Sequence, residues 1–334
     1  MSTVAPDMDP RTHGDDDFAA RTARHLGRRH ERFVAVEVRA GAVRRARAGL
    51  PDGADVEIGS VSKGLTGMLF ADSRDRGEVC DSTVLGDLLP LAGAPAAEVT
   101  LGSLATHSSG LPRLPSSSGA LRATLDLWRH GRNPYGESLD ELLAATRRTP
   151  VGRRRPHYSN LGYMLLGHAV AVAAGTTYAG LLRDRLAGPL EMTATTVPST
   201  PADLLPLAVP GRSRRGRPMQ PWTGEALGPA GGIRSTADDL GRLMKAVLDG
   251  TAPGLSALEP VTRLSGPVRV GAAWLTLERR GVALTWHNGG TGGFRSVVVL
   301  DRAAGAGVAV VSATARSVDR AGFALVEECV GTGG

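Results

Sequence analysis

The sequence predicts an α/β protein in which both ends of the chain build one antiparallel sheet, flanked by helices, with a mainly helical lobe inserted between the ends. Valine alternates strictly with other residues within 33–39, and short apolar runs alternate with glycine-rich turns within 268–312. Both patterns indicate strands. Between these regions, apolar residues recur at helical spacing, and proline or glycine separates the segments. Strands at both ends around a helical middle favour a single sheet.

The individual elements follow from local patterns. Residues 18–32 have a helical pattern, and a hairpin follows, with strands over 33–39 and 42–48 joined at Gly41. Helices are expected where apolar side chains fall three or four positions apart, over 60–76, 138–148, 161–174 and 236–248. Apolar runs bounded by glycine predict strands over 268–277, 282–287, 296–300 and 307–312, and a helix over 318–330 closes the chain.

Length and composition are those of a globular protein with a large core. The chain has 334 residues, of which 42% are hydrophobic and 22% charged, and this excludes collagen-like, coiled-coil and wholly disordered classes. At this length we expect two lobes. The division is a disordered tail over 1–17, a sheet lobe made of 18–60 and 225–334, and a mainly helical lobe over 61–224, with the active site at the interface of the lobes.

Charge and residue usage point away from nucleic acid. The formal net charge is +6, but the basic residues are nearly all arginines, since Lys63 and Lys245 are the only lysines in the sequence. These arginines are scattered, without a zinc-finger, helix-turn-helix or RNA-binding signature. Aromatic residues, which stack on single-stranded bases, make up only 4% of the chain. Nucleic acid is therefore not an expected partner.

We expect no metal, no cofactor and no membrane to take part in function. Cys80 and Cys329 lie far apart, and the histidines lack metal-binding spacing. No stretch of sequence reaches the roughly 18 apolar residues of a membrane span. Residues 1–17 carry aspartates where a secretory signal needs a basic start and an apolar run, so a cytoplasmic location is expected.

A first candidate for chemistry is the segment 57–64, Glu-Ile-Gly-Ser-Val-Ser-Lys-Gly, which places Ser60 and Lys63 three residues apart at the start of an expected helix. Residues at this spacing share a helical face, so the amine can lie beside the hydroxyl. A serine needs a neighbouring base to become a nucleophile, and lysine can be that base once burial or positive charge lowers its pKa. The alternative is a serine that only caps the helix.

A second candidate is Tyr158-Ser159-Asn160, at the entrance of another expected helix. A phenol held near an ammonium group can lose its proton, act as a general base and return the proton to a leaving group. The amide of Asn160 could orient a substrate or the lysine. The alternative is a half-buried tyrosine beside an asparagine that caps the helix.

A third candidate is the segment 286–294, Trp-His-Asn-Gly-Gly-Thr-Gly-Gly-Phe, at the end of an expected strand. Glycines let a backbone approach a ligand closely, and an edge strand offers N–H groups to a carbonyl oxygen. The N–H of Gly290, paired with that of Ser60, would form an oxyanion hole. The alternative is a glycine-rich hairpin turn with a partly buried histidine.

Together and in this order, the three segments resemble the motif set of the class C β-lactamases and the penicillin-binding-protein-like serine hydrolases related to them, which include esterases, D-aminopeptidases and transacylases. The stretches 99–112, 188–192 and 230–237 are also similar, so the resemblance runs from about residue 33 to the carboxyl end. It implies the β-lactamase/transpeptidase-like fold.

The resemblance also implies roles for single residues. Ser60 would be the acyl-accepting nucleophile, with Lys63 and Tyr158 as the pair that transfers the proton. The residues that would contact the substrate are Asn160, His287, Asn288, Gly289 and Gly290. His287 stands where β-lactamases usually carry the lysine of Lys-Thr-Gly. A histidine of ordinary pKa is mostly neutral at neutral pH, so it lacks the cation that pairs with a substrate carboxylate, and this favours ester or amide chemistry over β-lactam hydrolysis.

The sequence therefore predicts a serine acyl-enzyme hydrolase that acts on a small ester or amide. The alternative is a transacylase that passes the acyl group to an amine or alcohol in a natural-product pathway, and a third hypothesis is a catalytically silent ligand-binding module. A Ser/His triad is not expected, because the sequence lacks the Gly-x-Ser-x-Gly elbow. His107, in Thr-His-Ser-Ser-Gly, is accordingly interpreted as a structural loop residue.

Overall fold

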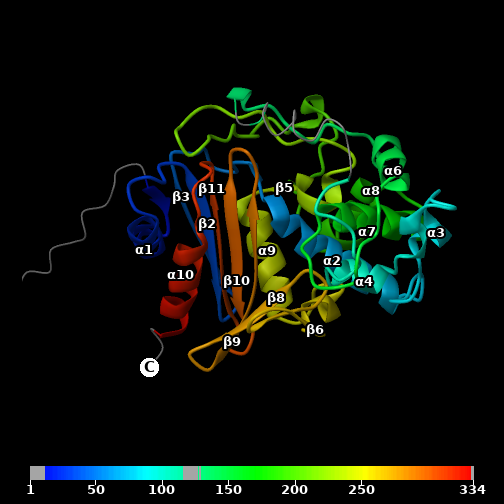
Figure 1. Cartoon of the computed structure of the whole chain (residues 1–334). Helices are drawn as coiled ribbons and strands as arrows, with labels where there is room; N and C mark the ends of the chain where they lie inside the picture. Colours follow the sequence, from blue (N-terminus) through cyan, green and yellow to red (C-terminus); the bar gives the residue numbers. More distant parts are fainter. Residues whose placement is uncertain (1–11, 116–126, 128, 332–334) are drawn as a thin grey trace, which may run out of the picture.

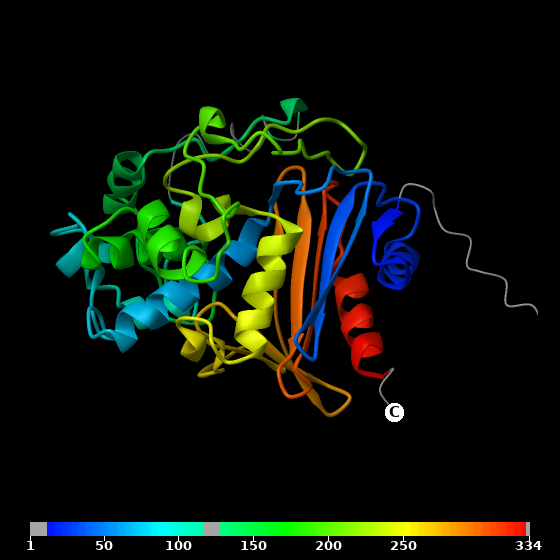
Figure 2. The same cartoon turned by 180° about the vertical axis from the view of Figure 1, so that it is seen from behind.

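The structure is a computed structural model, and it describes residues 12–115, 127 and 129–331. Figure 1 shows a twisted sheet with helices α1 (Asp16–Leu26) and α10 (Asp319–Gly331) on one face and α9 (Ala237–Leu248) on the other. A lobe made mostly of helices lies beside the sheet, on the side of α9. The view from behind in Figure 2 shows the same layers, with α9 between the sheet and this lobe.

Within the described residues, nine strands form the main sheet, in the order β1-β3-β2-β11-β10-β9-β8-β7-β6. Every neighbouring pair is antiparallel. The strands are β1 (Thr12–Gly14), β2 (Phe33–Arg39), β3 (Ala42–Ala48), β6 (Thr262–Ser265), β7 (Val268–Val270), β8 (Leu275–Arg279), β9 (Val282–Gly290), β10 (Arg295–Asp301) and β11 (Ala306–Ser312). Because β2 pairs with β11, the two ends of the chain meet in one sheet, and the predicted fold class is confirmed.

Alternation along β2 explains why the sheet has a core on each face. Val34 and Val36 point into the larger core, which α9 covers and which continues into the helical lobe. Phe33 and Ala35 point the opposite way, into a smaller core under α1 and α10. Both faces of the central strands are therefore buried, which explains why β2 and β11 carry few polar residues.

The helical lobe is built around two nearly fully buried helices, α2 (Ser62–Asp75) and α7 (Asn160–Ala173). Helices of this lobe within the described residues include α3 (Leu85–Leu88), α4 (Leu101–Ala105), α6 (Leu139–Arg147) and α8 (Tyr178–Leu182). No single described helix is long and apolar enough to cross a membrane. Within the described residues, α7 and the segment from Tyr178 to Ala187 are long and apolar enough only when they are taken together, and the chain bends by 77° between them.

Several predicted boundaries differ from the structure. The expected helix over 18–32 ends at Leu26, because Gly27 caps it with a φ of +71°, and the expected strand over 282–287 continues to Gly290. The expected tail over 1–17 is too long, because residues 12–14 form β1 at the sheet edge and α1 starts at Asp16; residues 1–11 lie outside the described part. The expected helix over 60–76 starts as a 3₁₀ turn, η1 (Gly59–Val61). The expected strand over 268–277 is split into β7 and β8, since the chain bends inward and buries Trp274, whose Nε1 donates to the carbonyl of Gly64 at 3.2 Å.

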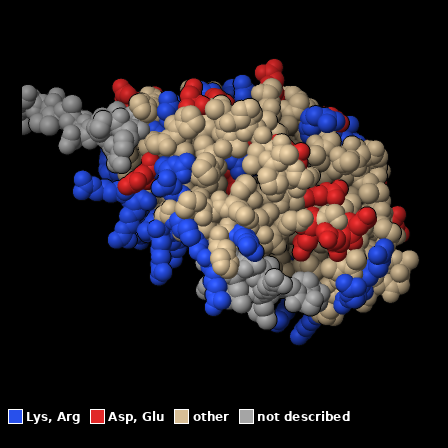
Figure 3. All heavy atoms as spheres, turned by 90° about the horizontal axis from the view of Figure 1, so that it is seen from above, with Lys and Arg blue, Asp and Glu red and all other residues tan. Residues whose placement is uncertain are grey.

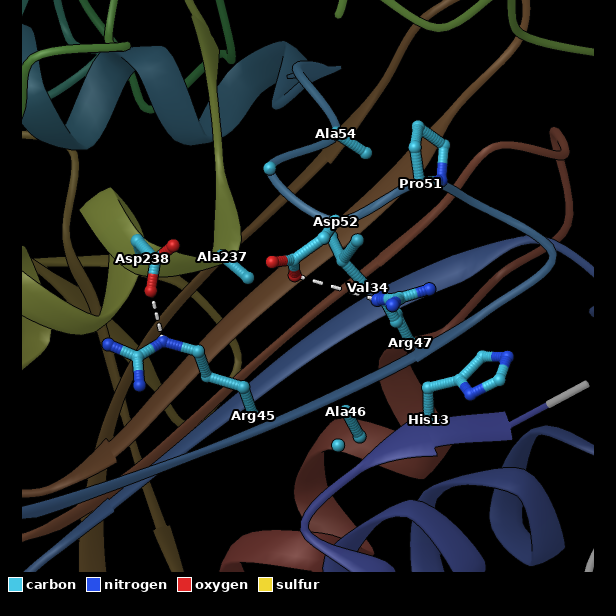
Figure 4. Close-up of a pocket in the computed structure, with 12 residues that line it drawn as sticks. His13, Val34, Arg45, Ala46, Arg47, Pro51, Asp52, Ala54, Ala237 and Asp238 are labelled. Carbon is cyan, nitrogen blue, oxygen red and sulfur yellow. Dashed lines mark ion pairs between the residues drawn. The ribbon is translucent and has the colours of Figure 1, made fainter.

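Charged side chains are unevenly distributed over the surface. Figure 3 shows that, on the face seen from above, basic side chains gather on the side of the molecule where α1 lies, whereas an acidic group lies over the opposite, helical side. Next to the edge strand β1, Arg45 and Arg47 of β3 form ion pairs with Asp238 and Asp52, around a small pocket of about 60 Å³ (Figure 4). Exposed pairs of this kind contribute little to stability.

A buried ion cluster joins the segments that lead to the first candidate motif. Two short strands, β4 (Val56–Glu57) and β5 (Arg234–Ser235), pair with each other outside the main sheet. The guanidinium of Arg234, 1% exposed, lies 3.0 Å from a carboxylate oxygen of Asp55 and 3.2 Å from Glu57 Oε1. Since η1 starts two residues after Glu57, this cluster sets where the chain enters the segment that carries Ser60.

Replacing Arg234 with Met should lower the free energy of unfolding by about 3–5 kcal/mol, because Asp55 and Glu57 would then be buried without their cation. Chemical denaturation measures this difference. The matched control is Arg183→Met, which removes an arginine from an exposed pair with Asp184 and should leave the midpoint unchanged. Equal midpoints for wild type and Arg234→Met would contradict the structural importance of the cluster.

Candidate active site

Ser60 lies in η1, where the chain passes from β4 to α2 and touches the end of β9. Gly59 has a φ of +52°, and a Cβ there would lie only 2.6 Å from the backbone nitrogen of Gly290. A side chain at position 59 would therefore push the two segments apart. Ser60 is partly buried and lines an open pocket of about 450 Å³.

Lys63 is fully buried in the first turn of α2, one turn beyond Ser60. Its Nζ lies 3.2 Å from Ser60 Oγ and donates a hydrogen bond to the carbonyl oxygen of Ala230. Burial lowers the pKa of Lys63 well below its usual range, and the charge of Arg113 lowers it further. The amine can therefore be uncharged near neutral pH, which is the state in which it can accept the proton of Ser60.

Tyr158 lies on the same pocket, with its ring centre 5.0 Å from Lys63 Nζ. Burial raises the pKa of Tyr158 to about 12, against the opposing effect of a hydrogen bond with Ser60. The phenol therefore keeps its proton at neutral pH. Burial thus favours the neutral form of both Lys63 and Tyr158. The expected roles of the two groups in proton transfer stay a prediction.

The loop that carries Tyr158 is held by its neighbours. Ser159, and not Asn160, caps α7, because its Oγ accepts a hydrogen bond from the N–H of Gly162 at 2.9 Å. The ring of His107 packs against Tyr158, with the ring centres 4.6 Å apart, and its Nδ1 accepts from the N–H of Ser159 at 3.3 Å. His107 thus supports this loop, in agreement with the structural role expected for it.

The two backbone N–H groups expected to form an oxyanion hole, those of Ser60 and Gly290, lie on two segments that touch each other. The N–H of Thr291 donates to the carbonyl oxygen of Phe294 at 3.1 Å. In an antiparallel ladder, residue pairs that exchange hydrogen bonds alternate with pairs that do not. Because Thr291 is hydrogen-bonded to its partner, the N–H of the neighbouring Gly290 points away from β10. On that side the pairing of β9 with β8 has already ended, at Trp286. A Cβ on Gly289 would lie 2.8 Å from the nitrogen of Ser60, so the end of β9 and η1 are in direct contact.

The other predicted substrate contacts divide into two groups. Asn288, Gly289 and Gly290 line the pocket that contains Ser60. His287 and Asn160 are not among the residues that line it. His287 is 2% exposed, its Nδ1 lies 2.7 Å from the carbonyl oxygen of Asn288, and burial together with the charge of Lys63 lowers its pKa to about 3. It is therefore a buried, neutral residue whose pKa responds to Lys63, and a substrate contact through it stays a prediction.

Several pocket residues lie outside the three motifs. Arg113, Leu127 and Trp222 fall in the segments 113–134 and 198–222, which the sequence suggests as the walls that select the acyl group. Arg295 and Asp319 stand at the starts of β10 and α10 and were not singled out. Their positions in the sequence carry no spacing signal, because each reaches the pocket through the packing of its own element.

Comparison with known proteins is consistent with this geometry. The profile of the beta-lactamase family matches residues 31–327. Among curated proteins, the chain is 31% identical over 201 residues to the D-alanyl-D-alanine-carboxypeptidase/endopeptidase AmpH of Escherichia coli (strain K12). That alignment covers 58% of this chain and 49% of AmpH, so the chain spans about half the length of this relative.

Solved structures show the likeness at the level of the fold. A class C beta-lactamase superposes with a TM-score of 0.79 at 17% identity, covering 98% of both chains. The D-alanine carboxypeptidase AmpC from Burkholderia cenocepacia superposes with a TM-score of 0.74 at 22% identity, covering 95% of this chain and 99% of the other. At such identities the superposition supports the architecture and not the substrate.

The rate at which Ser60 reacts with a fluorophosphonate should fall as the pH is lowered through the pKa of Lys63, because protonated lysine cannot accept the serine proton. The midpoint should lie well below 10.5. Burial and the charge of Arg113 both lower the pKa of Lys63. Arg113→Met removes the second of these effects, so the midpoint should move to higher pH. Labelling rates measured from about pH 5 to pH 10 test this.

The matched control is Arg263→Met, which removes an exposed arginine of β6 that does not line the pocket. Its midpoint should coincide with that of the wild type. A midpoint that stays in place in Arg113→Met would contradict the coupling between the Arg113 charge and the Lys63 amine.

Proposed function

This chain belongs to the beta-lactamase family of serine hydrolases, and we propose that it forms an acyl-enzyme through Ser60 and hydrolyses a small ester or amide. The single observation that carries the proposal is a buried lysine without an acidic partner among the described residues, whose Nζ lies 3.2 Å from a serine hydroxyl on an open pocket. Burying an amine without an acidic partner costs folding free energy. A role as the base of the reaction explains why a lysine is kept at this position.

The residues support a two-step acyl transfer. Ser60 Oγ forms a bond to the carbonyl carbon while its proton passes to the neutral amine of Lys63. The N–H groups of Ser60 and Gly290 stabilise the negative charge on the carbonyl oxygen. As the bond to the leaving alcohol or amine breaks, the Tyr158 hydroxyl donates its proton to the leaving group and regains one from Lys63. Water then attacks the acyl ester by the same route, releasing the acid and restoring Ser60.

Ester or amide chemistry is favoured over β-lactam chemistry by the state of His287. The resemblance to β-lactamases implies a lysine at this place, but His287 is buried and burial lowers its pKa to about 3, so it carries no charge at neutral pH. Any positive charge available to a substrate must therefore come from elsewhere in the pocket. A transacylase would use the same Ser60, Lys63 and Tyr158, and differs only in whether water or another nucleophile reaches the acyl ester.

Ser60→Ala should abolish both fluorophosphonate labelling and turnover of a chromogenic short-chain ester, because the hydroxyl that lies beside the Lys63 amine is then missing. Intact-mass spectrometry on a panel of esters should detect an acyl adduct on the wild type that is absent from this variant. Parallel incubations with amine acceptors distinguish hydrolysis, which yields the acid, from transacylation, which yields an amide. Ser199→Ala, at an exposed serine, is the control. Persistent labelling of Ser60→Ala would move the nucleophile elsewhere.

Tyr158→Phe should lower the turnover of the same ester by about 10²–10⁴-fold, since the ring still packs on His107 while the proton donor is lost. The loss should be smaller for an ester whose leaving group is a weak base and needs no proton. Rates for a nitrophenyl ester and an alkyl ester give this comparison. Equal losses for both esters would contradict a role of Tyr158 in protonating the leaving group.

A further inference from the structure

A second open pocket, of about 370 Å³, lies outside the site of Ser60. Its volume falls within the roughly 300–1,000 Å³ of small-molecule sites. Its walls come from α2, from α4 with the residues that follow it, and from the chain on either side of β6 and β7. Among the described residues, none lines both this pocket and that of Ser60. The fold therefore offers a second concave surface that the proposed reaction does not use.

Hydroxyl groups dominate the wall that α4 builds. Ser103 Oγ donates to the carbonyl oxygen of Thr100 at 2.7 Å, and Thr106 Oγ1 donates to that of Gly102 at 2.9 Å. Ser108 Oγ lies 2.9 Å from Thr106 Oγ1, whose proton is already used, so Ser108 is the donor of that pair. The three protons stay within the segment, and the oxygens keep lone pairs. This wall therefore suits a ligand that donates hydrogen bonds.

The charged side chains of the lining are already paired. Arg74 Nη1 lies 3.1 Å from Asp81 Oδ1, and Glu259 Oε1 lies 2.6 Å from Arg302 Nη2. Arg74 Nη2 also donates to Ser256 Oγ at 3.1 Å, which leaves the Ser256 proton for a ligand. Because each charge in the lining has an opposite partner, the pocket favours a neutral polar ligand over an ion.

An exposed apolar side chain stands beside these polar groups. Val261 lines the pocket and is 65% exposed, and Ala105 and Ala272 line it as well. A sugar ring has hydroxyl groups along its edge and C–H groups on its faces, so it can meet the serine and threonine oxygens and the valine at once. We propose that this pocket is a second ligand site and that it binds a neutral sugar. The site stands apart from Ser60, and its existence does not depend on the proposed function.

The pocket lies behind the segment that supports Tyr158. Thr106 and Ser108 line it, and the residue between them, His107, packs its ring against Tyr158. His107 has a φ of +57°, which residues other than glycine rarely adopt, so its ring position depends on the backbone around it. The carbonyl oxygen of Ala105 also accepts a hydrogen bond from a buried tyrosine, Tyr163, at 2.6 Å. A sugar held by Thr106 and Ser108 therefore acts on the position of Tyr158.

Saturation-transfer NMR tests the site with the methyl glycosides of glucose, galactose, mannose and N-acetylglucosamine. At least one should bind, whereas cyclohexanol, a ring with a single hydroxyl, should bind about tenfold more weakly or less. Methyl glucosaminide, which carries an amine in place of the acetamide, tests neutrality: tighter binding of this cation than of the acetamide would contradict a neutral ligand. Failure of all four glycosides to bind would overturn the site.

Variants assign the binding to this pocket. Val261→Trp fills the pocket from an exposed position and should abolish binding of the glycoside. Val282→Trp is the control, because Val282 is 36% exposed at the start of β9 and does not line the pocket. Binding that persists in Val261→Trp would place the sugar elsewhere and overturn the proposal. Should Val261→Trp fail to fold, Ser103→Ala decides, since loss of one acceptor should weaken binding by about 2- to 10-fold.

A kinetic measurement tests the link to Tyr158. At saturation, the bound glycoside should change kcat for a chromogenic ester by about twofold or more, and this response should be lost in Val261→Trp and kept in Val282→Trp. Binding without a change in kcat would overturn the link to Tyr158 and leave the sugar site. If no ester turns over at all, the proposed function fails, whereas the NMR experiments still decide the site.

Discussion

A buried guanidinium holds together the segments that make up the site. Arg234 pairs with Asp55 and Glu57 in a part of the protein where neither carboxylate could be left alone. Glu57 Oε1 also accepts a hydrogen bond from the backbone N–H of Trp222 at 3.0 Å, and Trp222 lines the pocket. The cluster therefore links three parts of the protein. They are β4, which precedes Ser60, β5, which follows the segment Gly228–Gly232, and the pocket wall at Trp222. By fixing these segments, the cluster helps to hold η1 against β9, so that Ser60 is in position before a substrate binds.

Burial, and not ion pairing, sets the protonation states inside the site. It lowers the pKa of Lys63 and His287 and raises that of Tyr158, so each of the three is driven towards its neutral form. A neutral amine can accept a proton and a neutral phenol can donate one, which gives the two groups opposite roles. The guanidinium groups of Arg113 and Arg295 line the same pocket as Ser60.

Much of this arrangement could be anticipated from short-range patterns. The alternation of residues 33–39 predicted β2, and its partner β11 was predicted as a strand by its own apolar run. The spacing of Ser60 and Lys63 predicted their contact, since a helical turn brings residues three apart together. The break between β7 and β8 could not be predicted in this way, because it depends on Trp274 packing under α2, about 210 residues away along the chain.

The sequence by itself determined the sheet formed from the two ends of the chain, the helical middle, and the serine, lysine and tyrosine that could carry chemistry. Only the tertiary structure decided that burial favours the neutral forms of Lys63 and Tyr158, that His287 is buried, and that Arg113 and Arg295 line the same pocket as Ser60. The physical reason is the distance along the chain over which each effect acts. Periodicity and spacing act within a few residues, whereas desolvation and charge depend on contacts such as that of Lys63 with the Ala230 carbonyl, between residues far apart in the chain.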